Sequence, residues 1–284
     1  MFSSLFRFGR STPAVKLRAS TAARVEILED RKMFAMGDNA SFIQPYYIPD
    51  FIDPNQQILV IEGTTGVDKF ELRNKSGGKV EVRLNGEKKG TFVAGFRTLL
   101  NTGGESDKVR VKGKINNLII QGSGGFDDIQ GGSGNDIILG YFGDDKLNGK
   151  KGRDIVIGGE GSDSVKGDVG EDILTGGSTD WDFLDGTGEW NYIPFIMIQS
   201  EWSRTDVTYS NRVLSVQGLA TGWNDVYKLD ASTVASGAIP PDALNGGGKQ
   251  DLFFISRDPA IDGKQDTIKN RKSNEVVVLI TYET

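Results

Sequence analysis

An aliphatic residue returns at every ninth position through the middle of the chain. The members of this series are Ile129, Ile138, Leu147, Val156, Val165 and Leu174. Their immediate neighbours are often polar, as at Lys146, Asn148 and Ser164. Since successive side chains of a strand point to opposite faces, each aliphatic residue predicts a three-residue strand with its middle side chain turned inward. Such short strands, joined by six-residue turns, predict a stack in which each strand pairs with the strand two repeats later, giving a coil of eighteen residues.

The polar flanks of these strands are interrupted by further apolar residues. Ile137, Ile155 and Ile173 precede three members of the aliphatic series, and Leu139 and Ile157 follow two of them. The outward faces of the stack are therefore not uniformly polar.

Glycine and aspartate share the same period, counted from Gly122 as position one. The first position holds Gly122, Gly131, Gly140, Gly149, Gly158, Gly167 and Gly176; the fourth holds Gly125, Gly134, Gly143, Gly152, Gly161 and Gly170; the sixth holds Asp127, Asp136, Asp145, Asp154, Asp163 and Asp172. Glycine permits a positive φ or a close backbone approach that a side chain would prevent. The glycines therefore predict tight turns that carry one aspartate each.

Stacking these turns brings like charges together. Strands pair about 4.8 Å apart, so Asp127, Asp145 and Asp163 would line one edge of the stack and the other three aspartates the opposite edge. Two carboxylates at that separation repel by about 3 kcal/mol at an effective dielectric constant near 20. A divalent cation between successive coils would reverse the sign of this interaction. Carboxylate and carbonyl oxygens form a hard ligand set that suits calcium better than zinc or copper.

The nine-residue pattern resembles the RTX (hemolysin-type) calcium-binding nonapeptide repeat, GGxGxDxUx. GGSGNDIIL at 131–139 and GGEGSDSVK at 158–166 match it throughout. The other four copies depart mainly at the second glycine, which is replaced by Ser123, Tyr141, Lys150 and Asp168. The resemblance implies an all-β, right-handed parallel β-roll, or β-solenoid, over residues 122–186, with several calcium ions held by the sixth-position aspartates and the glycine turns. A disordered Gly-Asp linker is the alternative, but it would have no need for a buried aliphatic column.

The region before the repeats predicts strands that lead into the solenoid over residues 58–121. GTTGVDKFE at 63–71 keeps the glycine and aspartate positions, KVEVRLNGEKKGTFV at 79–93 predicts a hairpin turning at Asn85-Gly86, and 107–120 predicts two short strands. Aspartates are too few here for complete cages. We expect this region to be largely free of metal, with Asp68 and Asp107 as secondary candidate ligands.

After Thr175 the period breaks, and Asp182 is a candidate ligand of the last ion. Phe195, Ile198 and Trp202 have helical spacing, and 207–216 predicts a second helix. We expect residues 187–242 to form a helical insertion that caps the open end of the roll. A groove for an aromatic or sugar ligand, built from Trp181, Trp190, Trp202 and Trp223, is the alternative.

The period returns once near the C-terminus. ALNGGGKQDLFF at 243–254 places Asp251 at the sixth position as a further candidate ligand, and EVVVLITY predicts a closing strand, so 243–284 is interpreted as a final repeat and strand. The course of the chain from GTTGVDKFEL to this segment resembles a recurring type of bacterial surface RTX protein.

The first forty residues differ from the rest in composition. They are basic, and RVEILEDRKMFA at 24–35 resembles the LEPR-type motif at the start of some bacterial surface proteins, with LEDR in place of LEPR. We interpret residues 1–40 as a targeting or flexible segment that does not join the fold; a short amphipathic helix is the alternative.

Composition narrows the chemistry. The 284 residues include no histidine and no cysteine, which removes Ser-His-Asp triads, thiol nucleophiles, disulfides and the common zinc ligands. The net charge of −6 argues against a nucleic-acid partner, and no apolar run is long enough for a membrane-spanning helix.

Together these features predict a calcium-binding, non-catalytic protein that is secreted or at the cell surface, and monomeric. Two alternatives remain: a calcium-dependent polysaccharide lyase or epimerase, since parallel solenoids can host such sites, and an adhesin. An extracellular or cell-surface polysaccharide is the candidate partner besides calcium. An HExxH protease is excluded, because that motif is absent.

Overall fold

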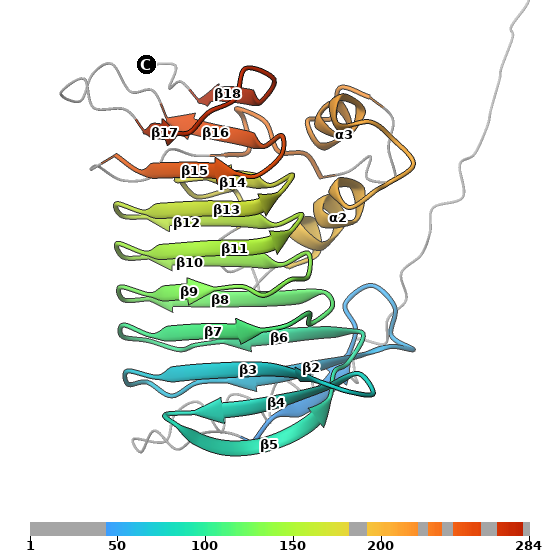
Figure 1. The fold of residues 1–284 in the computed structure, drawn as a ribbon, viewed down its shortest axis with the longest axis vertical. Helices are drawn as coiled ribbons and strands as arrows, with labels where there is room; N and C mark the ends of the chain where they lie inside the picture. Colours follow the sequence, from blue (N-terminus) through green and yellow to red (C-terminus); the bar gives the residue numbers. More distant parts are fainter. Residues whose placement is uncertain (1–43, 182–191, 221–226, 235–240, 257–265, 281–284) are drawn as a thin grey trace, which may run out of the picture. The chain divides into compact units, whose positions relative to one another are not determined.

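Two parallel sheets face each other across a narrow core (Figure 1). The computed structural model describes residues 44–181, 192–220, 227–234, 241–256 and 266–280. The expected targeting segment, Asp182, Trp190 and Trp223 lie outside these residues.

Each sheet has nine strands among the residues that the structure describes. Sheet A contains, in spatial order, β1 (Tyr46–Pro49), β2 (Gln57–Glu62), β6 (Arg97–Asn101), β8 (Leu118–Gly124), β10 (Ile137–Phe142), β12 (Ile155–Glu160), β14 (Ile173–Thr175), β16 (Leu252–Ser256) and β18 (Val276–Ile280). Sheet B contains β17 (Thr267–Lys269), β15 (Ala243–Gly247), β13 (Ser164–Gly170), β11 (Lys146–Gly152), β9 (Asp128–Gln130), β7 (Lys108–Lys112), β3 (Lys69–Lys75), β4 (Lys79–Leu84) and β5 (Glu87–Val93). Only β1, β4 and β5 run antiparallel to their neighbours within these described strands.

The expected coil of eighteen residues is confirmed. Ile137 pairs with Ile155 in sheet A, and Leu147 pairs with Val165 in sheet B, each eighteen residues further along the chain. Several strands are longer than the three residues expected: β11 runs from Lys146 through Gly149 to Gly152. The first-position glycine thus lies within the strand, although the pairing of β11 with β13 skips Gly149, and the turn is shorter than the spacing suggested.

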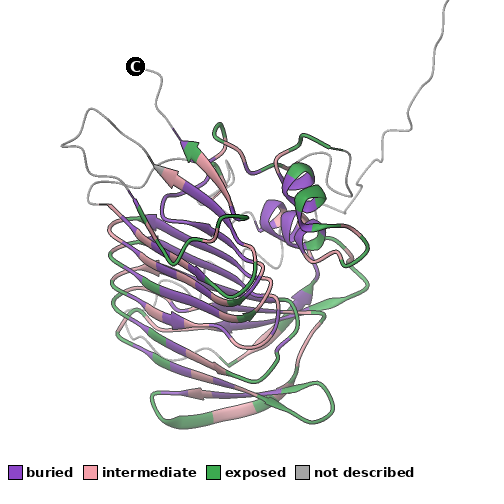
Figure 2. Ribbon diagram, turned by 45° about the horizontal axis from the view of Figure 1, so that its top comes forward, coloured by how far each residue is buried: buried purple, intermediate pink, exposed green. Residues whose placement is uncertain are grey.

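The aliphatic column fills the space between the sheets. Ile129, Ile138, Leu147, Val156, Val165 and Leu174 have no exposed surface and belong to one cluster. Figure 2 shows this buried interior running through the stacked coils. Successive coils thus repeat the same inward residue, and the core extends along the whole stack.

The stack continues on both sides of the repeats. The predicted hairpin is present, with β4 paired to β5 and Asn85 at φ +52° in its turn. The two strands expected over 107–120 correspond to β7 and β8. Beyond the insertion the chain adds four strands, β15 to β18, where one repeat and one closing strand were expected.

The two expected helices are α2 (Ile193–Trp202) and α3 (Tyr209–Val216), but they do not cover the end of the stack. Both lie beside the sheets, against the outward face of sheet A (Figure 1). Phe195, Ile198 and Trp202 share a buried cluster with the outward-facing residues Ile137, Leu139, Ile155, Ile157 and Ile173. The apolar residues found beside the aliphatic column in the sequence therefore form the surface of sheet A that the two helices cover.

Trp202 is the largest buried side chain of this contact and is not available for a surface groove. It is fully buried, its Nε1 donates to the Glu171 carbonyl oxygen at 2.6 Å, and its ring meets Tyr209 edge-on at 5.8 Å. Trp181 packs on Phe195 with ring centroids 5.9 Å apart. Both described tryptophans of the proposed aromatic groove therefore serve packing.

We expect Trp202→Ala to lower the free energy of unfolding by about 3–5 kcal/mol, because it removes a fully buried aromatic ring and leaves a cavity. Leu214→Ala on α3 is the matched control, since Leu214 is 39% exposed, and should cost less than about 1 kcal/mol. Urea unfolding in calcium measures both. Equal losses would contradict the packing of α2 on sheet A.

Candidate metal centre

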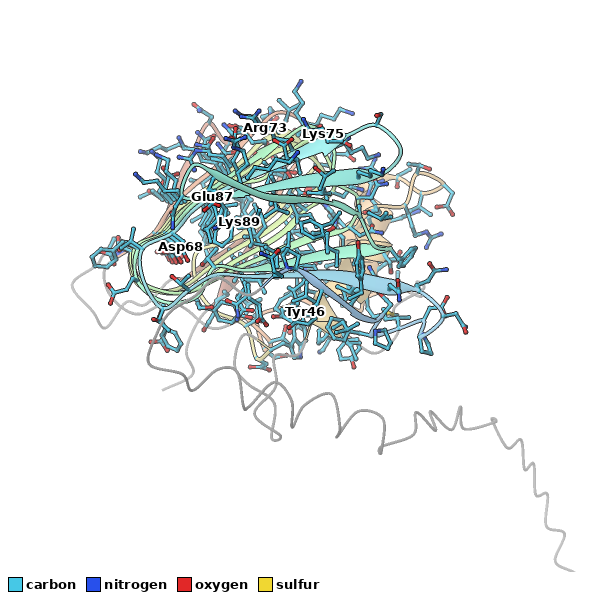
Figure 3. All side chains as sticks on the ribbon, turned by 90° about the horizontal axis from the view of Figure 1, so that it is seen from below. Tyr46, Asp68, Arg73, Lys75, Glu87 and Lys89 are labelled. Atoms are coloured by element: carbon cyan, nitrogen blue, oxygen red, sulfur yellow. The ribbon has the colours of Figure 1, made fainter. Side chains whose placement is uncertain are left out.

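Aspartates stack in single file along the two edges where the chain turns from one sheet to the other. In the first column, each backbone N–H donates to the Oδ1 of the aspartate one coil further on, at 2.7–3.0 Å. This column consists of Asp68, Asp107, Asp127, Asp145, Asp163, Asp242 and Asp266. Figure 3 looks along the stack and shows Asp68 at this turn edge. The second column, linked in the same way at 2.8–2.9 Å, consists of Asp136, Asp154, Asp172 and Asp251.

The second carboxylate oxygen of most column members is buried and has no hydrogen-bond partner within the described part of the chain. This holds for Oδ2 of Asp107, Asp127, Asp145, Asp154, Asp163, Asp172 and Asp251, and for Oδ1 of Asp136. Buried polar atoms are almost always hydrogen-bonded, and leaving a charged one unpaired costs several kcal/mol. A row of such atoms indicates that a bound ligand, and not another part of the protein, contacts these oxygens.

The first-position glycines lie directly against these oxygens. A Cβ on Gly140 would lie 2.4 Å from Asp145 Oδ2 and 2.4 Å from the Gly158 carbonyl oxygen. At Gly122 the same two kinds of oxygen would be 2.4 and 2.7 Å away, from Asp127 and from Gly140. Carboxylate and carbonyl oxygens thus converge beside Gly122 and Gly140, where a side chain would collide with both. Close approach, one of the two expected roles of glycine, is met here; the other, a positive φ, is adopted by none of the first-position glycines.

The fourth-position glycines meet the preceding coil. A Cβ on Gly143 would lie 1.5 Å from the Gly125 carbonyl oxygen, and one on Gly152 would lie 1.9 Å from that of Gly134. Gly143 and Gly152 also have positive φ, at +122° and +144°. Both expected roles of glycine, backbone freedom and close approach, are met at this position.

At the second position, the residues that replace glycine adopt a strained backbone conformation. Ser123, Tyr141, Lys150 and Asp168 stand where the pattern has glycine, and their φ values are +77°, +76°, +78° and +67°. Side chains in this region cost about 1 kcal/mol each. The turn geometry is therefore kept even where the residue disfavours it.

Burial raises the pKa of nine of the column aspartates, because an ionised carboxylate loses its hydration inside the stack. The pKa rises to about 7 at Asp127, Asp136, Asp163 and Asp251, to about 8 at Asp242 and to about 9 at Asp145, where the charges of Asp127 and Asp163 add to the effect of burial. Burial also raises the pKa of Asp154 and Asp172 well above its usual value. Without a cation, burial therefore favours the protonated form of these groups in the fold.

The structure brings the predicted aspartates together in the way the period implied. The six repeat aspartates and Asp251 occupy the columns, and so do Asp68 and Asp107. Sequence reasoning missed Asp242 and Asp266. Each begins an Asp-x-aliphatic triplet, Asp242-Ala243-Leu244 and Asp266-Thr267-Ile268, which could have identified them without the glycines.

The ligand set fits calcium. All the converging atoms are oxygens, with carboxylates contributed one per coil and carbonyl groups from the glycine turns. Among the described residues, no three acidic side chains gather at one point, so a bound ion would rely on carbonyl oxygens as well as carboxylates. Calcium accepts such mixed oxygen ligands at six to eight positions, and it would supply the positive charge that the columns lack.

Helices α2 and α3 are attached to the turns of the second column. Trp202 donates to Glu171, next to Asp172; Gln199 Nε2 donates to the carbonyl oxygen of Arg153, next to Asp154, at 2.5 Å; and the Tyr209 hydroxyl donates to the Asp251 carbonyl oxygen at 2.6 Å. The Arg153 and Arg212 guanidinium groups both contact Glu171. One turn edge is thus joined to the helices.

A parallel two-sheet solenoid with stacked aspartate turns defines a class of metal-binding repeat protein, and a comparison with family models agrees. Residues 121–156 and 148–180 match the model described as RTX calcium-binding nonapeptide repeat (4 copies). The chain therefore carries RTX calcium-binding repeats, which bind calcium ions. No curated protein and no solved structure matches the chain.

We expect the calcium-free roll to lose stability as pH rises from about 5 to 9. Asp127, Asp145 and Asp163 have raised pKa values when folded, at about 7 to 9, so the folded state holds more protons than the unfolded chain. Their contribution is fully present below the unfolded pKa near 4 and is lost as pH rises through the folded values. Thermal unfolding in chelator at several pH values measures this.

Calcium should reverse the trend, because it competes with the protons. The calcium concentration needed for folding should fall as pH rises over the same range. A calcium-free roll whose stability increases toward pH 9 would contradict the assignment of the raised pKa values to the columns.

Proposed function

We propose that this chain is a calcium-dependent, non-catalytic module that works as a monomer outside the cytoplasm, secreted or at the cell surface. The observation that carries the proposal is the row of buried carboxylate oxygens without partners along both turn edges. Calcium bound at the columns would neutralise them, so metal binding and folding of the repeats would be one event.

The ligands in this proposal come from both columns and from the glycine turns. They are the aspartates of the six repeats and Asp251, together with the carbonyl oxygens of the first- and fourth-position glycines that pack against the neighbouring coil. Asp242 extends the first column by one coil and Asp107 precedes it. We propose right-handed winding, because parallel crossover connections are almost always right-handed.

A weak affinity would suit a protein that folds after export. Extracellular calcium modules bind at about 10⁻⁴–10⁻³ M, which exceeds cytoplasmic calcium but not that outside the cell. The chain has no cysteine and so cannot form disulfides, which leaves bound metal ions as the means of cross-linking the fold. No helix among the described residues has the length and apolar character needed to cross a bilayer.

The non-catalytic role is supported by the way the acidic groups are used. The buried aspartates with raised pKa values belong to the two columns, and the sequence contains no histidine. No observation on the described residues favours a lyase or epimerase site, so we do not propose one.

Circular dichroism of the full chain against free calcium tests the proposal, with magnesium as the matched control. We expect a cooperative gain of β signal with calcium alone, because magnesium demands an octahedral site and gives up its water reluctantly. Equal signals in chelator and in calcium, at neutral pH, would refute calcium-dependent folding.

A further inference from the structure

The outward face of sheet B carries a concentration of basic residues at strands β3, β4 and β7. Alternate residues of these strands point outward, away from the core column. The basic face, as we define it, consists of Lys69, Arg73, Arg83, Lys108, Arg110 and Lys112. Figure 3 shows Arg73 on the side of the stack opposite Tyr46, which belongs to sheet A. The chain as a whole has a net charge of −6, so this face is opposite in sign to the molecule.

Cross-strand pairing places like charges side by side here. Lys69 pairs with Lys108 between β3 and β7, and Arg83 pairs with Lys88 between β4 and β5. Like charges directly opposite each other destabilise a sheet. Glu71 is paired with Arg83 and Arg110, and Arg73 with Glu81, so like-charge and opposite-charge pairs stand side by side on this face.

The carboxylates on this surface are too few to neutralise it. Glu71 is shared by Arg73 at 2.8 Å, Arg83 at 4.0 Å and Lys112, and the hydrogen bonds from Arg73 and Lys112 lower the pKa of Glu71 to about 2. Asp128 on β9 is shared by Lys108, at 3.5 Å, and Arg110. Glu81 on β4 is shared by Arg83 at 3.8 Å, Lys75 at 3.1 Å and Lys88 at 3.7 Å. Three carboxylates thus serve seven cations.

The face is hollowed where its cations are densest. A depression of about 240 Å³ is lined by five members of the basic face, all except Arg73, and by Glu71. The cations of neighbouring strands repeat at the strand spacing of about 4.8 Å. The surface therefore offers regularly spaced donors along a shallow trough.

We infer that the basic face binds a linear anionic polysaccharide bearing uronate groups. Its charge rows match a polymer with regularly spaced anions, and arginine donates to carboxylates through a planar fork. The outward-facing residues of β3, β4 and β7, all of which are described, include no aromatic side chain on which bases could stack and no large apolar side chain to enter a bilayer. A polysaccharide needs neither. This inference goes beyond calcium binding and requires only that these strands are folded.

The test is binding of a short oligouronate to the full chain in saturating calcium, at about 0.1 M salt, where charges interact over about 10 Å. The variant Lys69→Gln/Lys108→Gln/Lys112→Gln removes three exposed charges of the basic face. The control variant Lys228→Gln/Lys249→Gln/Arg271→Gln removes three exposed charges elsewhere in the described chain. We expect about a tenfold loss of affinity in the first variant and less than about a twofold loss in the control.

Three further arms decide between occupants: a neutral oligosaccharide of equal length, duplex DNA, and vesicles of anionic phospholipid. The inference predicts that the oligouronate binds more tightly than all three and that its binding is lost near 1 M salt, where screening acts within about 3 Å. Tighter binding to DNA or vesicles, equal losses in both variants, or no oligouronate binding by the unsubstituted protein would overturn it. Circular dichroism on the same samples reports folding, so a failure of calcium-dependent folding is seen separately.

Discussion

Gly143→Ala is expected to abolish calcium-induced folding of the roll. The added methyl group would lie 1.5 Å from the Gly125 carbonyl oxygen of the preceding coil, and Gly143 has a φ of +122°, which alanine adopts with strain. Backbone cannot retreat from backbone as a flexible side chain can. We expect a loss of at least about 3 kcal/mol in the free energy of unfolding.

Gly124→Ala is the matched control for this substitution. Gly124 adjoins Gly125 in the same repeat, but a Cβ there would meet nothing within 4 Å and its φ is not positive. The change should alter the free energy of unfolding by less than about 0.5 kcal/mol. Calcium titrations of both variants, followed by circular dichroism, measure the difference. A roll that folds normally with Gly143→Ala would contradict the close stacking of the turns.

Asp145→Asn is expected to separate calcium binding from folding. Asparagine keeps an Oδ1 that can accept the hydrogen bond from the Asp127 backbone N–H, which is 2.8 Å long with Asp145 in place. It has no negative charge with which to attract a cation. We expect the half-saturating calcium concentration to rise at least about tenfold, which is about 1.4 kcal/mol. In chelator the variant should be more stable than the unsubstituted protein, because Asp145 must otherwise take up a proton to be buried.

The opposite signs in chelator and in calcium are the signature of a ligand, since a merely damaged fold would be weaker in both. Asp144→Asn is the control: Asp144 is the exposed neighbour, and its Oδ1 accepts from the Ser162 backbone N–H at 2.9 Å. Its calcium requirement should change by less than about threefold, as for a surface charge. Identical shifts at Asp144 and Asp145 would remove Asp145 from the ligand set.

Most of the fold could be predicted from the nine-residue period, because the repeats place the same residue type in the same environment each time. The inward column at Ile138 and Val156, the eighteen-residue coil and the two aspartate edges followed from spacing alone. The hairpin at Asn85-Gly86 and the two helices followed from local turn and helix signals. These features depend on contacts that are near in sequence or are repeated.

The position of the helices could not be obtained in this way. Their apolar residues predicted burial without naming the surface that buries them, and the end of the roll is only one apolar surface of a solenoid. The outward isoleucines at 137, 155 and 173 were a signal for the face of sheet A, since a wet face would not need them. The insertion of residues between β14 and β15 then allows the stack to resume beyond the helices.

The aspartate columns also extend beyond the residues in which the glycine pattern is present. Asp242 and Asp266 continue the first column although the glycines of the repeat are missing before them, because an aspartate needs only the edge position and the Asp-x-aliphatic strand. Conversely, Tyr141 and Lys150 adopt positive φ in place of glycine, because the stacked neighbours dictate the turn. Tertiary stacking outweighs local preference at these positions.

The most direct measurement is anomalous diffraction from crystals of the protein grown in calcium. We predict two rows of anomalous peaks along the turn edges, beside Oδ2 of Asp127, Asp145 and Asp163 on one edge and of Asp154 and Asp172 on the other. A folded roll grown in calcium with no peaks beside these oxygens would contradict calcium binding at the aspartate columns.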